Sequence, residues 1–306
     1  MIRIDIIAGA RPNFMKIAPI IAAIELEKQK GTAIDFRLIH TGQHYDQKMS
    51  GDFFEQLGIP TPDVNLEAGG GTQAEQTAAI MIRYEKLLME KKPDLTLVVG
   101  DVTSTMACAI TAQKMNVKVA HVEAGLRTYG HDPFPEEMNR VLISKLANFH
   151  FCATEGNSQN LRTEGISQQQ IAVVGNTVID AINFFNVKRK LNTEKKSILI
   201  TLHRRENHKT VINETTKIIN QLANEFDSDF DWKFIKHPNP MAQAGYDSEF
   251  KSNPNITFLD PLPYPEMLME LSKSYLVLTD SGGFQEESTY LGTPTLVMRK
   301  TTERPE

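Results

Sequence analysis

Three carboxylates lie beyond two predicted strands in the amino-terminal half of the chain. Residues beyond the carboxyl ends of parallel strands meet at one edge of a sheet, where α/β proteins bind their ligands. Acids gathered there would suit proton transfer, with arginines neutralising them or burial raising their pKa values. The structural alternative for the first acid is that it caps the helix that follows it. The three acids are Asp101, Glu123 and Glu136, and the candidate arginines are Arg127 and Arg140.

A glycine pair followed by acids raises a second question of chemistry. The segment DSGGFQEE (280–287) follows the apolar run 275–279, so it is expected to turn from a strand into a helix. Bare Gly282 and Gly283 amides at a helix start would cradle a phosphate, with Glu287 holding sugar hydroxyls. Alternatively, Ser281 caps a helix whose first turn favours acids.

Cationic side chains also follow predicted strands. Arg11 and Lys16 lie in GARPNFMK (9–16), directly after a glycine turn, where they would face a ligand. The alternative is that both are ordinary solvated charges. His203 follows the run 197–202 and precedes two arginines. Arginine forks match phosphate oxygens, and histidine adds a hydrogen bond or a proton, although a lone histidine is more often structural.

The elements that must position these residues alternate regularly. Short runs rich in Val and Ile, separated by segments of helical period, predict parallel sheets covered on both faces. A polar stretch interrupts this rhythm, so we expect two doubly wound domains, residues 1–182 and 197–306, joined by a hinge at 183–196. The expected strands cover residues 3–8, 36–40, 95–99, 117–122, 150–153, 171–174, 197–202, 232–236, 256–259, 275–279 and 294–298.

Composition excludes several classes of protein. The 306 residues exceed the ~250–300 at which single cores tend to split, which favours two domains. The net charge of −5 without a long basic run argues against nucleic acid or an anionic membrane as a partner. Cys108 and Cys152 lie in apolar surroundings, which predicts buried free thiols in a reducing cytoplasm. The first strand is too short in its apolar part for a signal peptide, and no run approaches a membrane span.

Signatures of metal or nicotinamide binding are weak in this sequence. The histidines lack zinc-ligand spacing, and no cysteine pair supports them. Gly69–Gly71 fits the dinucleotide fingerprint only loosely, and no Walker loop occurs. We therefore expect neither a metal nor a nicotinamide cofactor.

Eight blocks carry a family resemblance. From residue 2 to 306 the chain closely resembles the non-hydrolysing UDP-N-acetylglucosamine 2-epimerases, which implies two Rossmann-like domains of the glycosyltransferase B type facing a cleft. The resemblance implies a cytoplasmic homodimer that eliminates UDP across C1 and C2 of its UDP-sugar to form 2-acetamidoglucal, then adds it back. The blocks are GARPNFMK, TGQH, GDVTST, HVEAGLRT, PFPEEMNR, HRREN, TDSGGFQEE and TTERPE.

The same resemblance implies roles for individual residues. The three acids Asp101, Glu123 and Glu136 match the groups to which proton transfer is attributed, and His203 matches a histidine near the phosphates. The start of the helix that binds the diphosphate in the family matches Ser281, Gly282 and Gly283. Glu287 matches the acid that holds the uridine ribose. The segment 260–267 matches the wall of the uracil site. Basic contacts to the nucleotide match Arg11, Lys16 and Arg304.

Alternatives remain open. The residues do not determine the sugar, so a 2-epimerase of a UDP-diacetamido-glucuronate or a hydrolysing epimerase stays possible. A glycosyltransferase of the same fold and a nucleotide-sugar sensor are more remote, and a sensor would not need three carboxylates. Family members usually continue for several dozen residues past TTERPE, so we expect the carboxyl-terminal domain to be incomplete.

Overall fold

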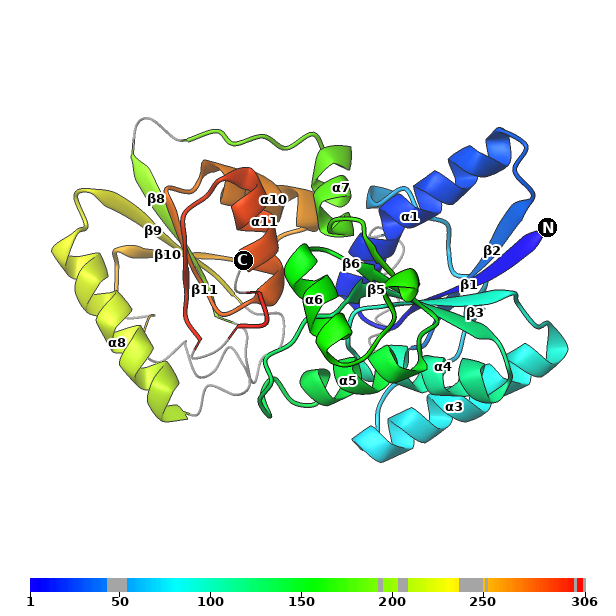
Figure 1. Ribbon diagram of the computed structural model, residues 1–306. Coiled ribbons are helices and arrows are strands. Elements are labelled where there is room, and N and C mark those ends of the chain that lie inside the picture. The colour runs from blue at the N-terminus through cyan, green and yellow to red at the C-terminus, as the bar shows by residue number, and fades with distance from the viewer. Residues whose placement is uncertain are drawn as a thin grey trace. The chain divides into compact units, whose positions relative to one another are not determined.

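The chain folds into two α/β units (Figure 1). The computed structural model describes residues 1–42, 54–191, 195–202, 209–236, 250, 253–299 and 302–304. Unit 1 comprises Met1–Ala181, and unit 2 runs from Ile182 to Arg304.

Unit 1 is built on a seven-stranded parallel sheet in the order β3-β2-β1-β4-β5-β6-β7. The central strands are buried along most of their length, as expected where helices cover both faces. The strands are β1 (Ile2–Ala8), β2 (Ile34–His40), β3 (Val64–Asn65), β4 (Leu95–Val99), β5 (Lys118–Ala124), β6 (Phe149–Cys152) and β7 (Ile171–Val173).

The helices of unit 1 follow local sequence signals. In α3, Thr72 and Glu75 form a capping box: Thr72 Oγ1 accepts from Glu75 N at 3.2 Å, and Thr72 N donates to Glu75 Oε2 at 2.7 Å. Ile80, Tyr84 and Leu88 recur at intervals of four and bury one face of α3 in a core that also contains residues of α4. The helices are α1 (Arg11–Gln29), α3 (Gln73–Glu90), α4 (Thr103–Lys114), α5 (Glu136–Leu146), α6 (Glu155–Thr163), the short 3₁₀ helix η1 (Gln168–Gln170) and α7 (Thr177–Phe184), which ends in unit 2.

Unit 2 carries a five-stranded parallel sheet in the order β10-β9-β8-β11-β12. Its core includes Ile200, Trp232 and Phe234, and the rings of Phe234 and Phe250 lie 5.1 Å apart. The strands are β8 (Lys196–Thr201), β9 (Phe230–Ile235), β10 (Ile256–Leu259), β11 (Leu276–Thr279) and β12 (Thr295–Val297), and the helices are α8 (Lys209–Glu225), α10 (Tyr264–Lys273) and α11 (Gly282–Leu291).

The predicted alternation of strands and helices is confirmed in both units, with one strand missed. β3 is a two-residue edge strand with partly exposed side chains, too short to show an apolar pattern. Part of the predicted hinge packs on unit 2: Arg189 Nη1 donates to Ser274 O at 2.6 Å, and Lys190 N donates to Ser272 O at 3.1 Å. The structure divides the chain after Ala181. The predicted limits of two domains and a hinge stay a prediction: 1–182, 183–196 and 197–306.

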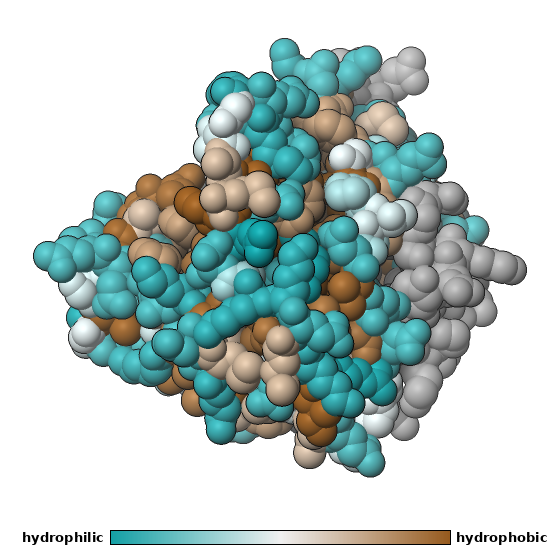
Figure 2. Space-filling view, turned by 90° about the vertical axis from the view of Figure 1, so that its right-hand side faces the viewer, coloured by the Kyte–Doolittle hydropathy of each residue, from teal (hydrophilic) through white to brown (hydrophobic). Residues whose placement is uncertain are grey.

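The face of unit 1 seen in Figure 2 is mainly hydrophilic, with apolar side chains in several separate groups. Throughout the described ranges, no helix is both long enough and apolar enough to cross a bilayer.

Candidate active site

Each sheet has a point at which the strand order reverses. In unit 1 the chain moves outward from β1 to β2 and β3, then returns to place β4 on the other side of β1. In unit 2 the equivalent point lies between β8 and β11. Ligands of open α/β sheets bind beyond the strand ends at such points. Asp101 follows β4, and Ser281, Gly282 and Gly283 follow β11, whereas His203, after β8, lies outside the described residues.

Asn13 joins the ends of β1 and β4. Its Oδ1 accepts from Ala10 N at 2.9 Å, and its Nδ2 donates to Val99 O at 3.0 Å. The turn before Asn13 also packs closely against Ser104 of α4, and this contact requires Gly9, because a Cβ there would lie 1.9 Å from Ser104 Oγ. The first turn of α1 is thus fixed against β4. Arg11 begins this helix, but its side chain is outside the described part of the structure.

Glu123 has an unusual backbone. Its φ is 65°, and the β5–β6 pairing shifts register between Val122 and Ala124. A non-glycine residue in this left-handed region costs roughly 1–2 kcal/mol. The bulge turns the carboxylate to Lys16 of α1, whose Nζ lies 2.5 Å from Glu123 Oε2, and the Glu123 side chain is only 5% exposed. The predicted cation and the predicted acid therefore form one buried ion pair.

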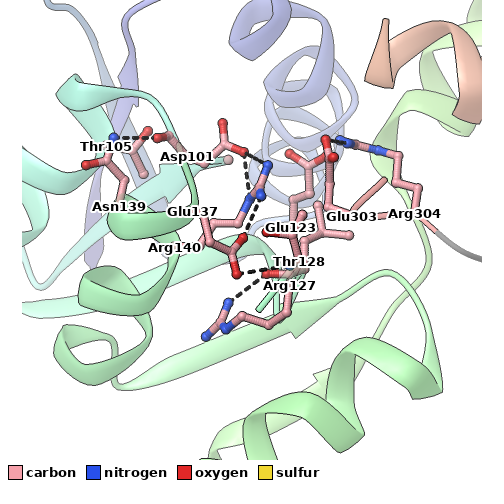
Figure 3. A network of polar contacts seen from close by, with 12 residues as sticks. Asp101, Thr105, Glu123, Arg127, Thr128, Glu137, Asn139, Arg140, Glu303 and Arg304 are labelled. Carbon is pink, nitrogen blue, oxygen red and sulfur yellow. Dashed lines mark hydrogen bonds and ion pairs between the residues drawn. The ribbon is translucent and has the colours of Figure 1, made fainter. Parts of the chain in front are cut away.

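Asp101 is held by Arg140 on one oxygen only. Arg140 Nε and Nη2 donate to Asp101 Oδ2 at 2.9 and 2.6 Å, and Arg140 Nη1 donates to Glu137 Oε2 at 2.9 Å (Figure 3). Asp101 Oδ1 accepts no hydrogen bond from any residue that the structure describes. The Asp101 side chain is 21% exposed, against 3% for Arg140. The capping alternative is wrong, because the N-cap of α4 is Val102 and no side chain caps that helix.

The backbone beside Asp101 is also fixed. His121 Nε2 lies 2.8 Å from Gly100 O, and Asn139 Nδ2 donates to Asp101 O at 2.7 Å. Burial lowers the pKa of His121 to about 4, so the neutral ring donates its Nε2 proton to that carbonyl. Gly100 has a φ of 71°, in the region that favours glycine. The Asp101 carboxylate is therefore presented from a rigid strand end.

Glu136 begins α5 and is half-buried. Its neighbour Glu137 is buried, and Glu137 Oε1 accepts from Thr128 N and Tyr129 N at 2.9 and 3.1 Å. The suggestion that Arg127 neutralises the acids is wrong. Arg127 Nε instead donates to Glu164 Oε1 at 2.6 Å, and Arg127 Nη2 donates to Ser144 Oγ of α5 at 2.8 Å.

The start of α11 lacks the features of the structural alternative. Ser281 occupies the N-cap position, yet its hydroxyl makes no cap hydrogen bond, and the first turn contains no acid. The amides of Gly282 and Gly283 thus begin a helix without a side-chain cap, as an anion site requires. Arg304 reaches the same point: a Cβ on Gly282 would lie 2.6 Å from Arg304 Nη1.

Glu287 lies one turn into α11 and is buried. Burial and then the nearby Glu287 carboxylate raise the pKa of Tyr264. Tyr264 belongs to the segment 260–267, so this segment adjoins Glu287 within unit 2. The structure thus groups Lys16, Asp101, Glu123 and Glu136 in unit 1, and Ser281, Gly282, Gly283, Glu287 and Arg304 in unit 2.

The sequence of this chain is similar to those of a known protein family. The family model of UDP-N-acetylglucosamine 2-epimerase matches residues 25–306. The UDP-N-acetylglucosamine 2-epimerase of Methanocaldococcus jannaschii is 39% identical over 99% of this chain and 85% of its own length. A UDP-2,3-diacetamido-2,3-dideoxy-D-glucuronate 2-epimerase of Pseudomonas aeruginosa is 37% identical over 97% of this chain and 83% of its own.

Solved structures agree. The crystal structure of the UDP-GlcNAc 2-epimerase of Neisseria meningitidis bound to UDP-GlcNAc superposes with a TM-score of 0.90 at 35% identity, covering 100% of this chain and 84% of that one. The expected fold class, Rossmann-like α/β units of the glycosyltransferase B type, is confirmed. The chain belongs to the UDP-N-acetylglucosamine 2-epimerase family.

Proposed function

We propose that this protein interconverts UDP-N-acetylglucosamine and UDP-N-acetylmannosamine by inverting C2 of the sugar without hydrolysing it. Beyond family membership, one observation supports this activity most. Asp101 and Glu123 lie at the carboxyl ends of adjacent strands, paired with Arg140 and Lys16 respectively, and Asp101 keeps one oxygen without a hydrogen bond from the described residues. Such carboxylates suit proton transfer at a carbon atom.

The proposed reaction proceeds by elimination and re-addition. The C2 proton is not next to a carbonyl, so its removal alone yields no stabilised anion. A carboxylate takes that proton while the bond from C1 to the UDP oxygen breaks, which leaves a C1–C2 double bond and free UDP. Protonation of C2 from the opposite face and attack of the UDP oxygen on C1 then give the epimer.

The residues receive proposed roles in this scheme. Asp101, through Oδ1, and Glu136 transfer the protons, and Glu123 orients the sugar while paired with Lys16. The amides of Gly282 and Gly283, the Ser281 hydroxyl and Arg304 stabilise the departing diphosphate, because charge develops there as the bond breaks. Glu287 holds the ribose, and Arg11 and His203 contribute phosphate contacts.

A 2-epimerase acting on a UDP-diacetamido-glucuronate is the second candidate. The Pseudomonas relative with that name is about as similar to this chain as several relatives named for UDP-N-acetylglucosamine. We further propose a homodimer in a reducing cytoplasm, working without metal or nicotinamide. The two buried free cysteines support the compartment, and the dimer rests on the family resemblance alone.

Product analysis tests the proposed activity. We expect incubation with UDP-N-acetylglucosamine to give UDP-N-acetylmannosamine in proton and phosphorus NMR spectra, with no accumulation of UDP. Release of UDP and free N-acetylmannosamine would instead identify a hydrolysing enzyme. Conversion of the diacetamido-glucuronate substrate alone would favour the second candidate, and no turnover of either sugar would contradict the proposal.

A further inference from the structure

The last described residues form a buried charged cluster on α11. Arg304 Nε donates to Glu286 Oε1 at 2.6 Å. Arg304 Nη1 donates to Glu303 Oε1 (Figure 3). Arg299 Nη2 donates to the other oxygen of Glu303 at 2.8 Å. The side chains of Arg304, Glu286 and Glu303 are only 14%, 12% and 2% exposed. Two carboxylates therefore hold the Arg304 guanidinium in one place.

That place is the amino end of α11. The guanidinium lies so close to Gly282 that a Cβ there would be 2.6 Å from Arg304 Nη1. The amino end of a helix carries a partial positive charge, so a cation beside it is unfavourable unless acids or a bound anion compensate. Thr302 Oγ1 also donates to Gln285 Oε1 at 2.7 Å, which fastens the segment before Arg304 to the same helix.

We propose that Glu286 and Glu303 are positioning residues for nucleotide binding. They hold Arg304 so that its guanidinium and the amides of Gly282 and Gly283 bind one diphosphate, that of the UDP-sugar. Gly282 is a glycine because this guanidinium occupies the space that a Cβ would need. The inference rests on the proposed function and adds that two acids beside the anion strengthen its binding.

The sign of one mutational effect tests this proposal. Removing a negative charge beside a dianion should strengthen binding by Coulomb's law alone, whereas loss of a positioning contact should weaken it. We expect Glu286→Gln and Glu303→Gln each to raise the Kd for UDP about tenfold in calorimetry, the scale of one lost charged hydrogen bond. The matched control Glu270→Gln removes an acid of α10 paired with Lys233 at 2.8 Å, and should leave the Kd unchanged.

The same substitutions made in the Arg304→Met variant distinguish the loss of Arg304 positioning from general damage to the fold. In Arg304→Met, which should itself bind UDP at least tenfold more weakly, adding Glu286→Gln should cause no further loss. Gly282→Ala should weaken UDP binding in the wild-type background and have a smaller effect in Arg304→Met, because the added Cβ displaces the guanidinium. Thermal unfolding of each variant shows whether it is folded.

The outcomes distinguish failure of the proposed function from failure of the positioning role of Glu286 and Glu303. A wild-type protein that does not bind UDP would overturn the proposed function. If UDP binds and Arg304→Met weakens it, but the folded Glu286→Gln and Glu303→Gln variants bind as tightly or more tightly, only the positioning role is overturned. Additive losses in the double variant would likewise contradict it.

Discussion

Replacing Asp101 by Asn is expected to lower turnover roughly 100-fold or more while leaving the affinity for UDP almost unchanged. The amide keeps the shape of the side chain, and its oxygen can still accept from Arg140, but it can neither take nor return a proton. Because none of the proposed contacts to the diphosphate or the ribose comes from Asp101, UDP binding should be largely spared. Steady-state kinetics and calorimetry measure the two quantities separately.

Asp94→Asn is a matched control at the other end of the same strand. Asp94 directly precedes β4, and its Oδ2 accepts from Arg3 N at 2.8 Å. This variant should keep its turnover. If Asp101→Asn also binds UDP and turns over normally, Asp101 is only a structural partner of Arg140.

Gly125→Ala should cost unit 1 about 2–4 kcal/mol of its free energy of unfolding. Gly125 has a φ of 86°, and an added Cβ would lie 2.3 Å from Asn157 O in the backbone of α6. A left-handed alanine costs about 1 kcal/mol, and moving a packed helix adds about 1–3 kcal/mol. Urea unfolding curves measure the loss.

Gly165→Ala separates the two contributions to that loss. Gly165 follows α6 with a φ of 85°, but an added Cβ would meet nothing within 4 Å. It should therefore lose only about 1 kcal/mol. Equal losses in the two variants would show that α6 does not press on Gly125.

Sequence patterns predicted the sheets well because buried parallel strands are short apolar runs between helices. The patterns also indicated which strand ends carry the acids, since carboxyl ends of parallel strands share one edge. They could not predict β3, whose two residues bury too little apolar surface to leave a pattern.

Individual side-chain partners were harder to predict. Arg127 and Arg140 are both near the acids in sequence, yet only Arg140 reaches Asp101, while Arg127 turns to Glu164. Asn13, His121 and Asn139 received no role, although all three support the strand ends that carry the acids. Their side chains bond to backbone carbonyls that are distant in sequence, and no local pattern records such a partner.

In the proposed reaction UDP leaves and returns while a carboxylate exchanges the C2 proton, so the hydrogen at C2 reports directly on the elimination. The epimerisation is run in heavy water, and the product is analysed by NMR and mass spectrometry. The account predicts that each UDP-N-acetylmannosamine formed carries deuterium at C2. Product that keeps its original protium at C2 would contradict the elimination.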